Sequence, residues 1–236
     1  MLFTIGNPKT VKGEAAGYLT AVLHLAPATE AGGPSVCPKA TPGCMLGCLN
    51  RAGRGGIVKR GETTNAVQSA RVRRTLAYFQ DREAFVAQLS YDLRTLRRRA
   101  KRRGLKLAVR VNGTSDLPAL ARELARSNPD LPFYDYTKIF AAAALEVAKV
   151  QRGVQYTFSR SESNAADVRR ALEAGINVAV VFDTAKGKPL PAQWQGRTVI
   201  DGDLSDLRFL DPCGVIVGLR AKGPARRDTS GFVVRM

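Results

Sequence analysis

The chain has 236 residues, of which 44% are apolar and 7% aromatic, a composition typical of a folded globular protein with one sizeable core. It contains no apolar run of about 18 residues, which excludes a transmembrane helix, and its N-terminus lacks the charged and apolar regions of a signal peptide. We therefore expect a cytoplasmic protein, with no membrane partner, whose thiols stay reduced.

The charge balance is strongly basic. There are 37 lysine and arginine residues against 20 aspartate and glutamate residues, which gives a formal net charge of +17. A positive field of this size attracts polyanions, so we expect nucleic acid to be a partner. The alternative is a solvated basic surface without such a partner.

Short β-branched runs alternate with helical patterns along the chain. The runs cover residues 18–27, 105–116, 131–138, 154–162, 176–183, 197–203 and 213–223, and the helical patterns cover 64–103, 117–127, 139–150 and 163–174. Several runs are short and continuously apolar, as in the central strands of a parallel sheet. We expect a single α/β domain over residues 1–236, built as a partial or small β/α barrel with a parallel sheet of six or seven strands. A doubly wound sheet is the alternative.

A loop rich in Cys, Gly and Pro, residues 28–62, follows the first predicted strand. Its cysteines, Cys37, Cys44 and Cys48, lie within twelve positions, close enough in sequence to share a metal ion or an iron–sulfur cluster. A redox disulfide and simple packing are the alternatives. A loop of this length is usually functional, so we expect a metal site here.

Zinc is the alternative to a cluster, and it needs a fourth ligand. The candidates are Cys213 and His24, the only histidine. Both also suit ordinary core positions, because His24 lies inside an apolar strand pattern and Cys213 begins another.

A helical basic segment, residues 64–103, comes next and is predicted to be two helices broken near residues 78–83. Its last ten residues, RTLRRRAKRR, carry seven basic side chains. Such a run tracks a phosphate backbone, or it marks an exposed helix end that Gly104 closes. The residues predicted to contact nucleic acid are Arg97, Arg98, Arg99, Lys101, Arg102 and Arg103.

Polar side chains follow nearly every predicted strand. In a β/α barrel the carboxyl ends of all strands meet at one face, so we expect these side chains to line one mouth. The candidates for binding a small-molecule cofactor are Asn112, Thr114, Ser115 and Asp116. The candidates for acid–base catalysis or anion binding are Lys138, Arg160 and Glu162, which otherwise pair with one another.

Four aspartates lie in the segment VIDGDLSDLRFLDP, residues 199–212. Paired carboxylates hold magnesium for phosphoryl or nuclease chemistry, with Asp203 as the catalytic candidate. The structural alternative is that Asp203 or Ser205 caps a short helix and Asp206 pairs with Arg208.

The position of the cysteine loop, directly after the first strand of a barrel-like series, resembles the radical S-adenosylmethionine superfamily. This resemblance implies that the three cysteines hold a four-iron cluster whose open iron binds S-adenosylmethionine. It also implies that NGTSD, residues 112–116, helps to hold the amino group of that cofactor. The resemblance is one of layout, because the cysteines here are separated by six and three residues and those of the superfamily by three and two.

A closer resemblance comes from a series of motifs: CPKATPGC, VRVNGTSDLP, YDYTK, FSRSESN, VAVVFD, VIDGDLSDLRFLDP and VIVGLRAKG. In this order, over roughly residues 20–235, they look like the gene-product-88 family of phages and bacterial mobile elements. The resemblance implies a mobile-element origin and a setting in the host cytoplasm.

The main functional hypothesis is a phage-type protein with a three-cysteine iron–sulfur or metal site at the barrel mouth. It would act on or with nucleic acid, by cluster- or S-adenosylmethionine-dependent modification if it is an enzyme. The first alternative is a non-catalytic DNA- or RNA-binding replication accessory with structural zinc. The second is a magnesium-dependent nuclease. The sequence leaves enzymatic activity and oligomeric state open.

Overall fold

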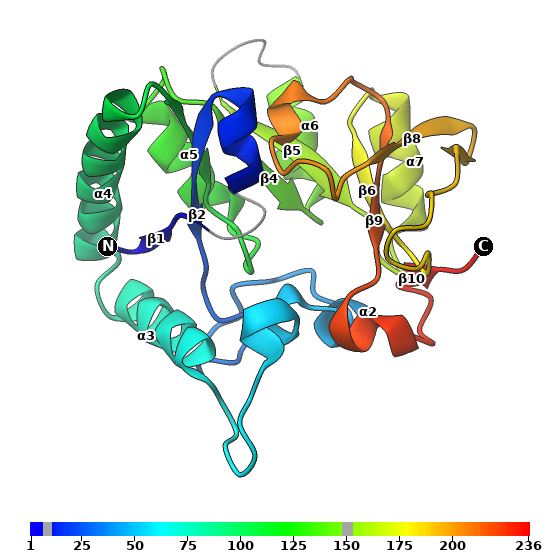
Figure 1. Cartoon of the computed structure of the whole chain (residues 1–236), viewed down its shortest axis with the longest axis horizontal. Helices are drawn as coiled ribbons and strands as arrows, with labels where there is room; N and C mark the ends of the chain where they lie inside the picture. Colours follow the sequence, from blue (N-terminus) through cyan, green and yellow to red (C-terminus); the bar gives the residue numbers. More distant parts are fainter. Residues whose placement is uncertain (7–10, 148–152) are drawn as a thin grey trace.

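Ten strands form one mixed, mostly parallel sheet in the computed structural model, which describes residues 1–6, 11–147 and 153–236 (Figure 1). The strands are β1 (Phe3–Thr4), β2 (Tyr18–Leu23), β3 (Lys106–Arg110), β4 (Phe133–Thr137), β5 (Val154–Ser159), β6 (Val178–Phe182), β7 (Gln193–Trp194), β8 (Arg197–Asp201), β9 (Ile216–Arg220) and β10 (Val233–Val234). Each of the seven predicted runs contains one of the longer strands, so those predictions are confirmed. The three two-residue strands were not predicted.

The order along the sheet is β1-β2-β3-β4-β5-β6-β9-β8-β7, with β10 beside β6. β1 and β7 are antiparallel to their neighbours, and the other pairings are parallel. The order follows the chain from β1 to β6, as in a β/α barrel, whereas a doubly wound sheet reverses direction. Within the described ranges the hydrogen-bonded path ends at β1 and β7 and is not closed into a barrel. The α/β class with a mostly parallel sheet is confirmed.

The helices also follow the predicted pattern. They are α2 (Pro42–Leu46), α3 (Ala66–Gln80), α4 (Arg82–Arg102), α5 (Pro118–Arg126), α6 (Phe140–Val147) and α7 (Ala165–Glu173), and the short 3₁₀ helices are η1 (Gly13–Ala16), η2 (Leu49–Arg51), η3 (Gly53–Gly56), η4 (Arg208–Leu210) and η5 (Gly223–Arg227). The predicted break between two helices is confirmed at Asp81, whose Oδ1 accepts a hydrogen bond from the Ala84 N–H (2.9 Å) and so caps α4. Part of the helix predicted over 139–150 lies outside the described residues. None of the helices within the described ranges has the length and apolar character that crossing a membrane requires.

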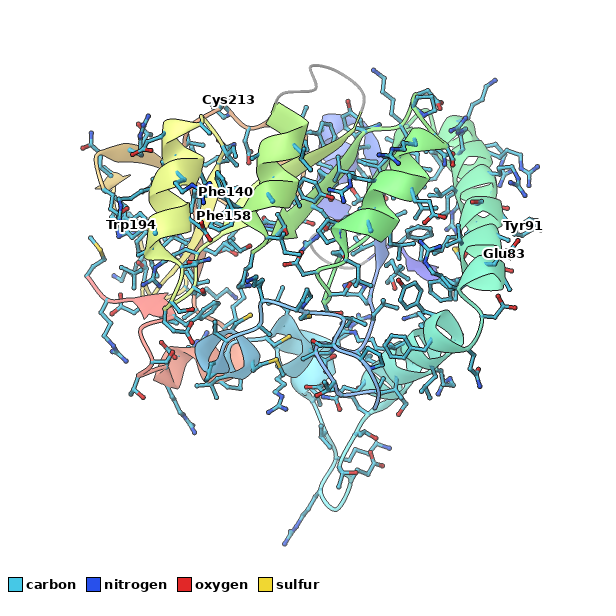
Figure 2. The ribbon with its side chains drawn as sticks, turned by 180° about the vertical axis from the view of Figure 1, so that it is seen from behind. Glu83, Tyr91, Phe140, Phe158, Trp194 and Cys213 are labelled. Atoms are coloured by element: carbon cyan, nitrogen blue, oxygen red, sulfur yellow. The ribbon has the colours of Figure 1, made fainter. Side chains whose placement is uncertain are left out.

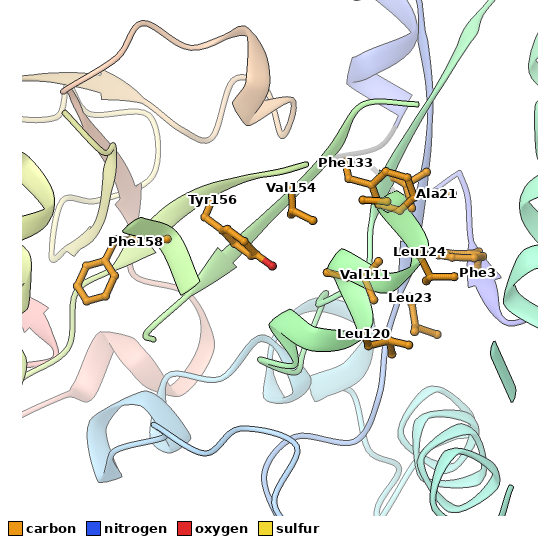
Figure 3. Packing of buried hydrophobic residues seen from close by; sticks show 14 of the residues in the cluster. Phe3, Ala21, Leu23, Val111, Leu120, Leu124, Phe133, Val154, Tyr156 and Phe158 are labelled. Atoms are coloured by element: carbon orange, nitrogen blue, oxygen red, sulfur yellow. The ribbon is translucent and has the colours of Figure 1, made fainter. Parts of the chain in front are cut away.

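The main hydrophobic core lies between the sheet and the helices seen from behind in Figure 2. Alternate residues of β5, namely Val154, Tyr156 and Phe158, point into it, and Leu120 and Leu124 of α5 pack in the same cluster (Figure 3). Burying each such side chain contributes about 1.5–3 kcal/mol. This packing fixes the strands and therefore the positions of the side chains at their ends.

The basic run at the end of α4 keeps a narrow apolar stripe. Leu89, Leu93, Leu96 and Ala100 are buried at spacings of three and four residues, and the basic side chains between them point outward. Gly104 follows the helix with a φ of 66°, a left-handed conformation that glycine adopts without strain. The run is therefore the solvated last turns of a core helix.

Candidate functional site

A pocket of ≈ 210 Å³ lies at the carboxyl ends of the parallel strands. Its walls come from β3 to β6, from β9, and from the cysteine loop with α2, which lies beneath the sheet in Figure 1. The predicted residues that line it are Cys37, Cys44, Cys48, Asn112, Thr114, Ser115, Asp116, Lys138 and Arg160. Glu162 and Asp203 are not among the residues that line it. The strand ends therefore converge, as parallel strands require, and the cysteine loop covers them.

The three thiols of the cysteine loop are free and partly buried. Burial raises the pKa of Cys37 to about 11 and also raises the pKa of Cys48. A charge on Cys44 raises both values further, which places the three sulfurs within electrostatic reach of one another. At neutral pH Cys37 and Cys48 are therefore protonated thiols, and a bound metal would have to displace their protons.

No group of three or more His, Cys, Asp or Glu side chains is placed to share a metal ion in the part of the chain that the structure describes. The cysteines line one pocket, but they do not form a preassembled ligand set. The three cysteines of the predicted metal site therefore line the same pocket, but their side chains are not arranged to coordinate one metal ion.

The Lys138 side chain interacts directly with these thiols. Its ammonium group forms a hydrogen bond with Cys44, and Asp116 and Cys37 are near enough to act on it. Burial by itself lowers the pKa of Lys138, but these neighbours raise it on balance. Lys138 is therefore a fixed positive charge beside the thiols, suited to stabilise thiolate or another anion.

The turn at residues 112–116 is held rigidly beside the pocket. The Asn112 N–H and Nδ2 donate to Asp135 Oδ2 (3.0 and 2.8 Å), and Asn112 Oδ1 accepts from Ser115 Oγ (2.8 Å). A Cβ atom at Gly113 would lie 2.7 Å from His24 Cδ2 and 2.8 Å from the Leu23 carbonyl oxygen, so only glycine fits there. Sequence therefore predicts a binding turn, and the structure shows how β2, β3 and β4 hold it.

Asp116 completes this turn by joining it to the end of β4. Its carboxylate accepts hydrogen bonds from Thr137 Oγ1 and from the Lys138 N–H, both at 2.8 Å. Burial raises the pKa of Asp116. The carboxylate fixes the backbone from which Lys138 extends and so acts as a positioning residue.

Glu162 contacts the cysteine loop instead of lining the pocket. Its Oε1 accepts from the Gly43 N–H and its Oε2 from Thr41 Oγ1, both at 2.8 Å. A carboxylate here stabilises the first turn of α2, the helix that carries Cys44. Its predicted catalytic role stays a prediction, and the contacts describe a residue that positions the loop.

The C-terminal segment forms a wall of the pocket that sequence reasoning missed. Arg160 Nη1 donates to the carbonyl oxygens of Gly231 (2.6 Å) and Phe232 (2.7 Å), and the Phe232 side chain lines the pocket. β10 pairs with the end of β6 through Val233 and Val234. A two-residue strand has no periodicity to reveal it, and only the isolated apolar run FVV offered a sign.

Buried ion pairs lie on the face of the sheet opposite the main core. Arg110 pairs with Asp206 (3.2 Å), approaches Asp135 (3.8 Å) and lies over the Tyr136 ring, 4.6 Å from its centre. Arg110 and Asp206 also line the pocket. Burial raises the pKa of Asp135 to about 7, whereas Asp206 raises the pKa of Arg110 in spite of its burial. The sequence showed Arg110 only as a charge that interrupts an apolar strand.

The four aspartates of residues 199–212 are each bound to a basic side chain. Asp206 pairs with Arg110 and not with Arg208, which pairs with Asp211 (3.1 Å), so the predicted Asp206–Arg208 pair is wrong. Asp203 pairs with Lys222 (2.5 Å) and Arg220 (3.3 Å). Asp201 pairs with the same arginine at 2.9 Å. These contacts describe a scaffold that orients cations at the ends of β8 and β9.

The two candidates for a fourth metal ligand do not line the pocket. Cys213 is exposed, so its expected core position is wrong, and Figure 2 shows it at the end of the molecule opposite α2. It borders a second cavity of ≈ 970 Å³ at the amino ends of the strands. Burial, together with Arg71, Arg110 and Arg74, lowers the pKa of His24 to about 3, so His24 is neutral.

The arginine run of α4 also lies away from the pocket. Its C-terminal turn leads into the start of β3, so it sits at the amino ends of the strands. Arg97 pairs with Asp130 (3.0 Å) and Arg103 with Glu14 (2.7 Å), while the other members are exposed. Nucleic-acid binding by this run stays a prediction, and any strand held there would be remote from the cysteines.

Comparison with known proteins places the chain in a family. No curated protein and no solved structure matches the chain, so the resemblance to the radical S-adenosylmethionine superfamily is not supported. The family model described as gene product 88 matches residues 1–236. The chain therefore belongs to the gene product 88 family, the phage and mobile-element family that its series of motifs resembles.

Proposed function

We propose that the protein is a cluster-dependent enzyme in which Cys37, Cys44 and Cys48 bind an iron–sulfur cluster at the mouth of the strand-end pocket. The observation that carries the proposal is the gathering of three thiols with Lys138 and the 112–116 turn around one pocket of ≈ 210 Å³. Elsewhere in the described residues the single remaining cysteine, Cys213, is exposed and distant. The cysteines that line the pocket therefore all come from the cysteine loop.

The residues suit such a group by their chemistry. Thiolates are soft ligands that favour iron–sulfur clusters and zinc, and three of them leave a cluster with one open position. Lys138, hydrogen-bonded to Cys44, offsets the negative charge that deprotonated thiols bring. A bound cluster would supply one-electron chemistry or an open iron for a ligand.

The surrounding side chains suit an anionic small molecule. Arg160, Arg220 and Lys222 line the pocket together with Lys138, and Asp116 and Asp206 are the carboxylates among its lining residues. Asp203 and Asp201 hold Arg220, and main-chain carbonyls hold Arg160, so these cations are oriented before a ligand arrives. Preorganised charge of this kind binds carboxylate or phosphate groups well.

The test is metal and acid-labile sulfide analysis, with a visible absorption spectrum, on protein purified without oxygen. We expect about four irons per chain, as in thiolate-bound four-iron clusters. The Cys44→Ser variant should lose the iron, and Cys213→Ser should retain it, because Cys213 lies at the other end of the molecule. If iron is present, addition of S-adenosylmethionine should perturb the spectrum.

One zinc per chain with no iron would contradict this proposal and would support the alternative of a structural zinc site. Metal-free protein from both aerobic and anaerobic preparations would contradict the proposal altogether. Equal iron loss in Cys44→Ser and Cys213→Ser would show that the loop cysteines are not the ligands.

A further inference from the structure

The part of the chain that covers the pocket carries a strong excess of positive charge. Residues 31–74 contain eight basic side chains and one acidic side chain, Glu62. We define the cap surface as the exposed basic residues of the 31–62 loop and of η5 that have no ion pair in the described ranges: Lys39, Arg54, Lys59, Arg60, Arg226 and Arg227.

The two segments of the cap surface are in direct contact. A Cβ atom at Gly223, the first residue of η5, would lie 3.1 Å from the Arg51 carbonyl oxygen and 3.4 Å from Ala52 Cβ. In Figure 1, α2 and η5 lie side by side beneath the sheet. The two segments therefore lie at the same end of the molecule, which we call the cap face.

The pocket opens onto this face. Lys39 lines the pocket and is also exposed, and the same holds for Leu49, which is 47% exposed. A ligand attached to a larger molecule on the cap surface would thus have a direct way into the pocket.

Exposed apolar side chains are interspersed among the cap cations. Ile57 is 70% exposed and Val58 36% exposed, and both directly precede Lys59 and Arg60. Cations beside apolar side chains match a flexible strand that offers phosphates and unpaired bases, because a duplex keeps its bases stacked inside. An anionic membrane offers phosphates too, but it does not offer unpaired bases, and lipid vesicles therefore serve as the competing ligand in the test.

We propose that the cap surface binds single-stranded nucleic acid and presents one of its nucleotides to the pocket. Binding of nucleic acid to the cap surface does not require the proposed cluster. Only the reaction of the presented nucleotide in the pocket rests on the proposed function. It differs from binding by the α4 run, because the five-residue strands separate that run from the pocket by about 17 Å. The phosphate of the presented nucleotide would meet the oriented cations Arg160, Arg220 and Lys222.

Two matched four-charge variants of the full chain test the proposal. The cap variant carries Arg54→Gln, Lys59→Gln, Arg60→Gln and Arg227→Gln, and the α4 variant carries Arg98→Gln, Arg99→Gln, Lys101→Gln and Arg102→Gln. Each loses three arginines and one lysine, all exposed. Fluorescence anisotropy would measure their binding to labelled 30-mers of deoxythymidylate and of uridylate over a salt series, and the pair of oligomers separates DNA from RNA.

We expect the cap variant to bind at least about tenfold more weakly than the parent at 0.1 M salt. The slope of its log affinity against log salt concentration should be smaller in magnitude by about two to three. The α4 variant should stay within about twofold of the parent. The proposal is overturned by equal losses in both variants, by a loss confined to the α4 variant, or by a parent that binds neither oligomer. Tighter binding to anionic lipid vesicles than to either oligomer would overturn it too.

A measurement on the unsubstituted protein covers the case in which the cap variant does not fold. Bound oligomer should protect Lys39 and Lys59 from acetylation and leave Lys101 and Lys106 reactive. The reverse pattern would contradict the cap surface. Metal analysis of the same protein separates the two proposals, because iron can be absent while the oligomer still binds.

Discussion

Glu162 Oε1 accepts a hydrogen bond from the Gly43 N–H at 2.8 Å, so a residue after β5 holds the first turn of the helix that carries Cys44. The two residues are 119 positions apart. The cysteine loop is therefore tied to the barrel-like sheet by a carboxylate as well as by its own local hydrogen bonds.

Replacement of Glu162 by Ala should loosen the cysteine loop. The change removes two hydrogen bonds and a favourable charge at the start of α2, with an expected loss of about 1–2 kcal/mol. Hydrogen exchange of the peptide that spans residues 41–48 would report it, and Glu162→Gln should show a smaller effect. As a control, Glu123→Ala removes an exposed pair with Arg82 and should leave this peptide unchanged. Unchanged exchange in Glu162→Ala would contradict the positioning role.

Arg110→Met should be among the most destabilising single substitutions. It removes the guanidinium that pairs with the buried carboxylate of Asp206 and approaches that of Asp135, and breaking a buried ion pair typically costs about 3–5 kcal/mol. Urea denaturation would measure the loss, and Arg103→Met, which removes a surface pair with Glu14, should cost less than about 1 kcal/mol.

The cost of Arg110→Met should also depend on pH. Without the guanidinium, the buried carboxyls bind protons more tightly in the folded than in the unfolded chain, so protonation stabilises the fold. The difference between variant and parent should therefore shrink as the pH falls from 7 to 5. A difference that is independent of pH would show that the lost interaction is packing and not charge.

His24 should remain neutral through the physiological range. Its pKa of about 3 lies below the ordinary 6.5, so the unfolded chain takes up a proton that the folded chain does not. The stability that it contributes is fully present above pH 6.5 and is lost as the pH falls toward 3. Because it is the only histidine, its ring C–H resonances can be followed by NMR without comparison with other histidines, and a midpoint between pH 6 and 7 would contradict the burial of its ring.

The thiols should differ in reactivity when no metal is bound. Iodoacetamide attacks the thiolate, so Cys37, with a pKa of about 11, should be alkylated slowly at pH 8 and about tenfold faster for each unit of added pH. The exposed Cys213 should react first. Mass spectrometry of quenched samples would rank the four cysteines, and equal rates for Cys37 and Cys213 would rule out the burial of Cys37.

The sequence predicted the seven long strands and the convergence of their polar ends, because period and composition reflect burial directly. It also predicted that Asp116, Lys138 and Arg160 would meet, since parallel strands bring their carboxyl ends together, but Glu162 and Asp203 do not line the pocket. It could not predict the partners of Asp206, which depend on where β3 lies relative to η4. Nor could it predict β10, whose two residues acquire their conformation only by pairing with β6.

The contribution of β10 has a consequence for how the protein is made. Phe232 lines the pocket, and a Cβ atom at Gly47 would lie 2.9 Å from its ring, so it packs closely on the cysteine loop. A ribosome delivers the cysteines long before Phe232, and until that residue emerges the thiols lack their last wall. During that interval the loop stays open to solvent, so a group that the pocket encloses can be inserted while the chain is still being synthesised, and the segment around Phe232 then closes it in.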